Sequence, residues 1–292
     1  MRWRKVALIG VGLLGGSLGL ALKRRKLADA VHGFVRRQAS VGECEQLGVV
    51  DKAHLEIPAA VNGADLIVFC TPLAQMRKLA EQIRNQISAV VTDVGSVKSS
   101  VVEDLEPIFL ESKSQFVGSH PMAGAEKTGP SAATADLFEQ AVCVITPTAN
   151  TDPAAVEKVE NLWRSVGAVP RRMSPEAHDE LVSRSSHLPH VLAAELVNYV
   201  LDAAHPKEQG MLCANGFRDS TRIASGSPEM WRDICLANRR RLIHALEGFS
   251  AELNRFRDAL QKGDASAVER FFQTAKERRD AWQGQRTSPS PE

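Results

Sequence analysis

The chain has 292 residues, of which 43% are hydrophobic and 24% are charged, values that are ordinary for a globular protein and leave room for two domains. Its formal net charge of +1 argues against a general nucleic-acid-binding surface. No apolar run is long enough to cross a bilayer, and the five cysteines lack the spacing of a metal site or a secreted disulfide framework. We therefore expect a cytoplasmic protein with reduced thiols and with no metal, membrane or nucleic-acid partner.

Short apolar runs alternate with amphipathic segments through the first part of the chain. Strands are predicted at residues 5–10, 31–35, 64–70, 89–95, 115–120, 141–147 and 168–173, and helices at 14–26, 73–87 and 153–167. Continuous apolar strands that alternate with helices indicate a mostly parallel sheet that is covered on both faces. Residues 1–172 are therefore predicted to form an α/β domain.

The pattern changes after Met173. Apolar residues recur at three- and four-residue offsets in segments 174–205, 228–263 and 264–283, and no strand signal follows. Residues 173–283 are predicted to be all-helical. Their helices carry apolar residues on more than one side, which favours a subunit interface and a homodimer. Pro189 should interrupt its helix, and the polar segment 284–292 is predicted to be a disordered tail.

A glycine-rich turn follows the first strand. Gly10, Gly12 and Gly15 form the pattern GxGxxG between a strand and a helix, as in dinucleotide-binding folds. In that interpretation the first helical residues, Leu13 and Leu14, present free N–H groups to the cofactor phosphates. A glycine-rich packing turn is the alternative.

The end of the second strand bears on the choice of dinucleotide. NAD sites usually place an acidic residue there, but this chain has Val35, followed by Arg36 and Arg37. Arginines bind a 2′-phosphate that a carboxylate would repel, and Ser40 offers a further donor. The sequence favours NADP, with a permissive NAD site as the alternative.

Three further segments follow predicted strands, at the sheet edge where doubly wound folds bind ligands. They carry Thr71 and Pro72, then Ser96 and Lys98, and then His120 in a glycine-rich loop. All are expected to line the nicotinamide end of the cofactor. His120 is a candidate general base, and Ser96 a candidate hydrogen-bond partner for its other ring nitrogen or for the substrate. A structural role for His120 is the alternative.

The helical half adds two basic pairs. His187 and His190 lie three residues apart, and Arg218 and Arg222 lie four apart, so each pair shares a helix face. Such a set could bind a dianionic substrate. The alternative is a network of ion pairs between subunits.

Four segments together resemble the prephenate/arogenate dehydrogenase family of tyrosine biosynthesis. They are GSHPMAGAEKTG (118–129), DVGSVK (93–98), SHLPH (186–190) and GFRDSTRIASGSPEMW (216–231). The resemblance implies a Rossmann-like N-terminal domain, an all-α C-terminal dimerisation domain and an active site between them. It also implies NAD(P)-dependent oxidative decarboxylation of prephenate to 4-hydroxyphenylpyruvate, or of arogenate to tyrosine.

By the same resemblance, His120 takes the proton of the ring hydroxyl while Ser96 positions that histidine. Arg222 binds a substrate carboxylate, and His190, with His187 and Arg218, supports the pocket. Two further residues are implied in substrate binding: Trp231, supplied across the dimer, and Ala125, which stands where the family commonly has a hydroxyl residue.

Two alternative functions fit these residues less well. A related reductase of imines or 3-hydroxy acids would use a lysine or another acid in the helical domain, which the paired histidines and arginines argue against. A non-catalytic dinucleotide-binding regulator would not need His120, Ser96 and Arg222 together.

Overall fold

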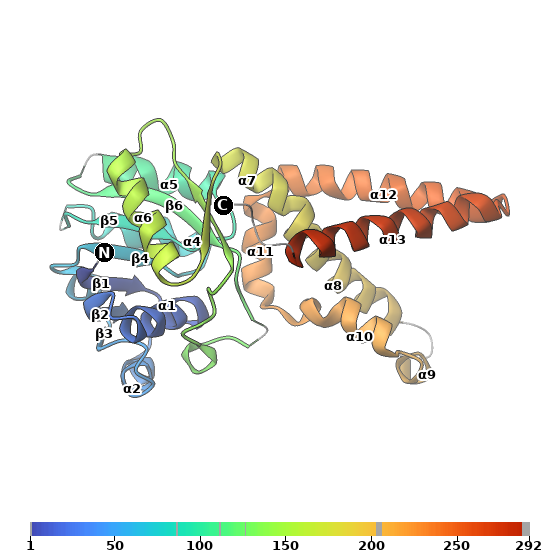
Figure 1. Ribbon diagram of the computed structural model, residues 1–292. Helices are drawn as coiled ribbons and strands as arrows, with labels where there is room; N and C mark the ends of the chain where they lie inside the picture. Colours follow the sequence, from blue (N-terminus) through green and yellow to red (C-terminus); the bar gives the residue numbers. More distant parts are fainter. Residues whose placement is uncertain (1, 86, 111, 126, 203–205, 288–292) are drawn as a thin grey trace. The chain divides into compact units, whose positions relative to one another are not determined.

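The computed structural model describes residues 2–85, 87–110, 112–125, 127–202 and 206–287 (Figure 1). By its internal contacts the chain divides into two units, Met1–Arg241 and Leu242–Glu292. The first unit contains the sheet and the candidate site, and each unit is described by itself.

The first unit is built on an eight-stranded sheet with the order β3-β2-β1-β4-β5-β6-β7-β8. Only β6 and β7 pair antiparallel, so the prediction of a mostly parallel sheet is confirmed. The sequence missed β3, because Ala53 is its one apolar residue. The strands are β1 (Trp3–Ile9), β2 (Ala28–Phe34), β3 (Lys52–His54), β4 (Leu66–Phe69), β5 (Val90–Asp93), β6 (Gln115–Pro121), β7 (Val142–Thr146) and β8 (Val169–Arg172).

Helices cover both faces of this sheet, and each face has its own apolar core. Val6 and Leu8 of β1 point to one core, whereas Ala7 and Ile9 point to the other, as the two-residue period of a strand requires. In Figure 1, α1 and α6 lie on the face turned to the viewer. The first core includes residues of α1 (Leu13–Arg24), α2 (Gln38–Gln46) and α6 (Pro153–Ser165), and the second includes residues of α3 (Ile57–Val61), α4 (Leu73–Glu81) and α5 (Ser99–Leu110).

The helical half begins directly after β8, as predicted. Helix α7 packs on α5 and β7, and α11 packs on α4. These contacts join the helices before Arg241 to the α/β part. The boundary between the two units, after Arg241, therefore lies well beyond the boundary between residues 172 and 173 at which the sequence pattern changes. The elements are α7 (Pro175–Val182), the π-helical turn η2 (Ser183–His187), α8 (Leu188–Leu201), α9 (Pro206–Met211), α10 (Asn215–Thr221), the 3₁₀ turn η3 (Arg222–Ser225) and α11 (Pro228–Ala237).

The second unit contains most of α12 (Arg239–Gln261) and all of α13 (Ala265–Thr287). The ring of Phe256 lies 4.5 Å from that of Phe271 and 5.9 Å from that of Phe272, measured between centroids. Because α13 continues to Thr287, residues 284–287 are helical where the sequence predicted a disordered tail. The rest of that predicted tail, residues 288–292, lies outside the described residues.

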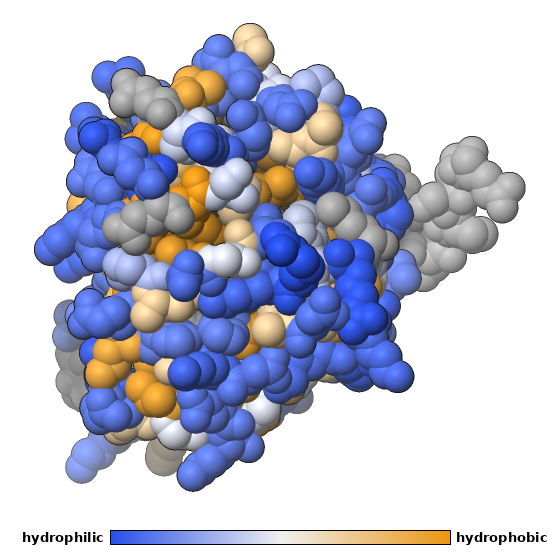
Figure 2. All heavy atoms as spheres, turned by 90° about the vertical axis from the view of Figure 1, so that its left-hand side faces the viewer, coloured by the Kyte–Doolittle hydropathy of each residue, from blue (hydrophilic) through white to orange (hydrophobic). Residues whose placement is uncertain are grey.

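The surface of the α/β part is mostly polar on the side seen in Figure 2, where apolar side chains appear in small groups. Among the described residues, no helix combines the length and the apolar character that crossing a membrane would require.

A close approach of α1 to the backbone gives a test of this packing. A Cβ atom at Gly19 would lie 1.9 Å from the Val49 carbonyl oxygen, whereas one at Gly42 of α2 would meet no atom within 4 Å. We expect Gly19→Ala to lower the free energy of unfolding by about 1–3 kcal/mol through overpacking. Gly42→Ala should raise it by ~0.5–1 kcal/mol through helix propensity. Urea denaturation measures both changes, and equal stability of Gly19→Ala and the parent would contradict the packing.

Candidate active site

The glycine turn lies at the carboxyl edge of the parallel strands, where β1 passes into α1. Gly10 has a φ of +100°, a conformation that side-chain-bearing residues rarely adopt. A Cβ at Gly15 would lie 2.2 Å from the Gly10 carbonyl oxygen, so α1 can approach the turn this closely only with glycine there. Local structure therefore requires two of the three glycines, whatever they bind.

Gly12 and the start of α1 have the features that a dinucleotide phosphate needs. A Cβ at Gly12 would meet no atom within 4 Å, so the space beside it is open. Gly12 is also the N-cap of α1, which has no side-chain cap and no acidic residue in its first turn. The N–H groups at Leu13 and Leu14 thus remain available to an anion. Among the described residues, the buried Thr71 Oγ1 after β4 lacks a hydrogen-bond partner. These features fit a nicotinamide dinucleotide.

The three residues after β2 divide into one buried and two exposed side chains. Val35 is buried, and its N–H donates to the His54 carbonyl (2.9 Å). Arg36 and Arg37 are exposed, and Arg37 is the N-cap residue of α2. The arginines are thus solvent-accessible at the end of the second strand, as the NADP interpretation requires.

His120 lies in β6, past the end of the ladder between β5 and β6. That ladder ends at Val117, and β6 then pairs with β7 from Gly118 to Pro121. The strand predicted at residues 115–120 is therefore confirmed and continues to Pro121, so His120 lies in a strand rather than in the glycine-rich loop that follows. The His120 side chain is 8% exposed. Burial lowers the pKa of His120 well below its usual value, and charge on His178, Lys98 and His187 acts in the same direction.

A hydrogen-bonded pair of side chains on α7, His178 and Asp179, contacts the Nδ1 side of the His120 ring. The Nδ1 atom of His120 lies 2.8 Å from Nε2 of His178, and Nδ1 of His178 lies 2.7 Å from Oδ1 of Asp179. The prediction that Ser96 binds the second ring nitrogen of His120 is wrong, because His178 occupies that nitrogen. Both α7 side chains are fully buried.

Asp179 also joins α7 to the start of α5. Its carboxylate accepts the backbone N–H groups of Lys98 (2.7 Å) and Ser99 (2.9 Å). Burial alone would raise the pKa of Asp179. Hydrogen bonds from His178 and from the two backbone N–H groups outweigh that effect and hold the pKa below its usual value. Asp179 is therefore a carboxylate at neutral pH.

Lys98 does not line the cofactor site, contrary to the prediction. Its ammonium group is fully buried, forms an ion pair with Asp93 and donates to the Ser119 carbonyl (2.8 Å). Asp93 also accepts the N–H groups of Gly95 (2.7 Å) and Ser119 (3.0 Å). The backbone bends after β5 so that the lysine points into the protein, where it anchors β6 just before His120.

Asn238 links His187, in the π-helical turn, to Asp179. Nδ2 of Asn238 donates to the Asp179 carbonyl oxygen (2.8 Å) and lies 3.2 Å from Nδ1 of His187. Burial lowers the pKa of His187 to about 4, an effect that Asp179 and the Ser96 backbone only partly oppose. The structure therefore brings the Ser96 backbone to His187, and His187 is neutral at pH 7.

His190 and Trp231 form a stacked pair beside His187. The rings of His190 and Trp231 lie 3.9 Å apart with an interplanar angle of 29°, and His187 meets Trp231 edge-on at 6.2 Å. Burial lowers the pKa of His190, and the positive charge of Arg222 acts in the same direction. His187, His190, Trp231 and Arg222 thus belong to one neighbourhood.

Three further predicted site residues lie as follows. Trp231 stacks on His190 of its own chain, and its supply across the dimer, which the resemblance implies, stays a prediction. Arg218 is exposed and pairs with Asp219 (3.5 Å). Ala125 is exposed in the segment after β6.

The positions of His178 and Asp179 in the helical pattern, which the sequence analysis missed, mark them as candidate buried residues. They fall at the same helical face as Pro175 and Val182, with spacings of three, four and seven residues, and that face is buried. An adjacent His-Asp pair on the apolar face of a helix is a buried polar group that needs partners. Asn238 carried no comparable signal.

Comparison with known proteins agrees with this geometry. The family model for the prephenate dehydrogenase nucleotide-binding domain matches residues 18–171, and the model for the prephenate dehydrogenase dimerization domain matches residues 174–276. The chain is 37% identical over 280 residues to a prephenate dehydrogenase of Bacillus subtilis. The aligned region covers 94% of this chain and 75% of the relative.

Two solved structures are similar over nearly the whole chain. A prephenate dehydrogenase of Aquifex aeolicus, in complex with hydroxyphenyl propionate and NAD⁺, has a TM-score of 0.89 and 33% identity and covers 96% of this chain and 99% of that one. An arogenate dehydrogenase of Synechocystis has a TM-score of 0.80 and 29% identity, covering 95% and 99%. With a glycine turn and a buried histidine at one sheet edge, and with both domains matched, the chain belongs to the prephenate dehydrogenase family.

Proposed function

We propose that this protein is an NAD(P)-dependent dehydrogenase that oxidatively decarboxylates prephenate to 4-hydroxyphenylpyruvate. The observation that carries the proposal is His120, a buried neutral imidazole at the same sheet edge as the glycine turn. The relatives named above include both prephenate and arogenate dehydrogenases. Arogenate, which would give tyrosine directly, is therefore the second candidate substrate.

His120 acts as the general base in this proposal. A bound nicotinamide dinucleotide supplies the acceptor for the hydride that leaves the ring carbon bearing the hydroxyl group. Nε2 of His120 takes the hydroxyl proton as the hydride departs, which makes the oxygen a better electron donor. Loss of CO₂ leaves an aromatic ring, so the protein has chiefly to orient the ring and hold the proton.

The Arg222 neighbourhood is proposed to bind the carboxylates of the substrate. Arg222 is exposed near His190, so its guanidinium can reach a ligand. His190, His187 and the Trp231 ring would form the wall beside it, and Ser96 would contact the substrate hydroxyl or the cofactor. Arg218 and Ala125 are proposed to lie at the periphery of this pocket.

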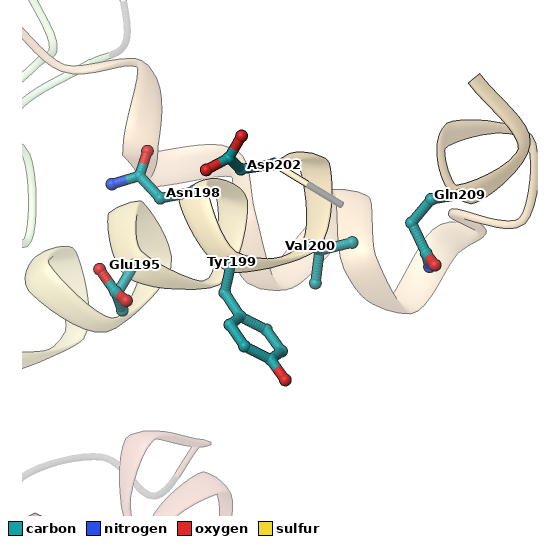
Figure 3. Close-up of a pocket in the computed structure, with 6 residues that line it drawn as sticks. All are labelled: Glu195, Asn198, Tyr199, Val200, Asp202 and Gln209. Carbon is teal, nitrogen blue, oxygen red and sulfur yellow. The ribbon is translucent and has the colours of Figure 1, made fainter. Parts of the chain in front are cut away.

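A homodimer is proposed on the basis of exposed apolar side chains. Tyr199 is 80% exposed, Met211 82% and Leu212 79%, and such residues mark interaction surfaces when they cluster. Figure 3 shows Tyr199 projecting from α8 beside a pocket lined also by Glu195, Asn198 and Gln209. The match to a dimerization domain supports a second copy of this chain as the occupant.

A cytoplasmic location is also proposed. All five cysteines are free thiols, which fits a reducing compartment.

The proposal is tested by mixing the protein with prephenate or arogenate and with NAD or NADP, following reduced cofactor by its absorbance. We expect turnover with at least one combination. His120→Asn should lower kcat by ~10²–10⁴-fold, the usual contribution of a general base, while dinucleotide binding measured by fluorescence stays unchanged.

Because the pKa of His120 is lowered, the base stays unprotonated as pH falls. The kcat of the parent enzyme should therefore not decline around the ordinary histidine pKa of about 6.5. No turnover in any of the four combinations would refute the function, and near-normal turnover of His120→Asn would refute the role of His120.

Arg222→Ala should chiefly weaken substrate binding. Loss of a charged hydrogen bond to a carboxylate corresponds to a rise in KM of about 10- to 100-fold, with a smaller change in kcat. Arg218→Ala is the matched control, since its side chain is paired with Asp219, and its effect on KM should be smaller. Steady-state kinetics with varied substrate decide this, and an unchanged KM for Arg222→Ala would place the carboxylate contact elsewhere.

NADP is the proposed preferred cofactor, through Arg36 and Arg37. Replacing both by alanine should weaken NADP binding by about 10-fold or more, because charge-assisted bonds to the 2′-phosphate are lost, and should leave NAD binding nearly unchanged. Arg84→Ala, an exposed arginine beyond the end of α4, is the control. Titration of cofactor fluorescence measures both constants. Equal losses for NAD and NADP would contradict the proposal.

A further inference from the structure

We propose that His178 and Asp179 are positioning residues that hold His120 in the tautomer with its proton on Nδ1, so that Nε2 is the free base. Three side chains form one line of hydrogen bonds from α7 to β6, with contacts of 2.7 and 2.8 Å. Which nitrogen donates in each of these hydrogen bonds follows from Asp179, the residue at one end of the line.

The Asp179 carboxylate accepts hydrogen bonds at both oxygens. Its Oδ1 accepts the Lys98 N–H and its Oδ2 accepts the Ser99 N–H, so both carboxylate oxygens face donors. Burial alone would raise the pKa of Asp179, but the hydrogen bonds from His178, Lys98 and Ser99 outweigh it, so neither oxygen carries a proton at neutral pH. Asp179 therefore only accepts, and Nδ1 of His178 must carry the hydrogen of their shared bond.

The direction then passes to His120. A neutral His178 with its proton on Nδ1 has a lone pair on Nε2, which can only accept. Nδ1 of His120, 2.8 Å away, must then donate. A neutral imidazole has one N–H, so Nε2 of His120 has none. It is the nitrogen that can receive a proton.

Burial keeps His178 neutral. Lys98 and Asp93 of the β5 end, His120 of β6, and Asp179 of α7 face it, while Arg241 lies 3.9 Å from the far carboxylate oxygen. Burial and the Lys98 charge lower the pKa of His178, against the opposing effect of Asp179. A doubly protonated His178 would donate to His120 and reverse its tautomer.

The same line stabilises His120 after it has accepted a proton. The new proton enters at Nε2, the existing proton stays on Nδ1, and the positive ring then donates to His178, whose own N–H points to the Asp179 carboxylate. The arrangement resembles in its logic a carboxylate that orients a catalytic histidine and stabilises its imidazolium, with a second imidazole interposed.

The tautomer is measured directly by NMR of protein labelled with ¹⁵N-histidine, using His120→Asn to identify the His120 signals. We expect the parent protein to show a protonated Nδ1 and an unprotonated Nε2 at neutral pH. The opposite tautomer in the parent protein would overturn the proposal, and this measurement needs no variant of His178 to fold.

Two variants at one position test the functional consequence. His178→Phe removes the acceptor, and we expect kcat to fall by about 10²-fold or more with KM nearly unchanged, as Nε2-protonated His120 appears in the spectrum. His178→Gln can donate to Asp179 with its amide nitrogen and accept from His120 with its oxygen, and should retain at least about 10-fold more activity than the phenylalanine variant. Equal kcat of the two variants, or a phenylalanine variant as active as the parent, would overturn the proposal.

Glu180→Gln is the matched control on the same helix. Glu180 is the next residue along α7, but its carboxylate is half-exposed and pairs with Arg184, so this change should leave kcat and the His120 tautomer unaltered. The kinetic arm rests on the proposed function, whereas the NMR arm does not. A parent protein with the expected tautomer but no turnover would therefore refute the function and leave the tautomer assignment standing.

Discussion

The carboxylate of Asp179 is the contact on which the site depends. It accepts the backbone N–H groups of Lys98 and Ser99 at the start of α5, and so serves as a cap for a helix that has no acidic residue in its first turn. Because Asp179 belongs to α7, the cap also fixes the first helix of the helical half to the sheet. One buried charge thus aligns the two structural layers whose side chains meet at the site.

A second buried charge holds the opposite side of His120. Lys98 and Asp93 are fully buried as an ion pair, and the pair also binds the Ser119 backbone at its N–H and its carbonyl. Such a pair contributes little net stability, because desolvation of both charges offsets their attraction. Its use here is positional. The Ser119 hydroxyl adds bonds to the Asp93 carbonyl (2.6 Å) and to Trp163 Nε1 (3.0 Å), so the residue preceding His120 is held on every side.

The parts of this fold that the sequence predicted are the parts that local rules determine. The glycine turn was predicted because the conformation of Gly10 and the close contact at Gly15 depend only on the adjoining strand β1 and helix α1. His187 and His190 were predicted to share a face, and both contact Trp231. Asp179 and His178 were missed because polar residues on a helix are normally solvated, although both share a helix face with the apolar Pro175 and Val182. The inward turn of Lys98 was likewise decided by a partner, Asp93, whose burial no local pattern reports.

The π-helical turn at Ser183–His187 has a consequence for the direction in which α8 faces. It ends just before Pro189, which has no N–H to offer the preceding turn. Such a turn contains one residue more than α-helical winding would use. One residue of α-helix corresponds to a rotation of about 100°. If the same residues wound as a regular α-helix, His190 would be rotated by about that angle away from Trp231, so the extra residue of the π-helical turn sets the direction in which α8 presents the His190 ring.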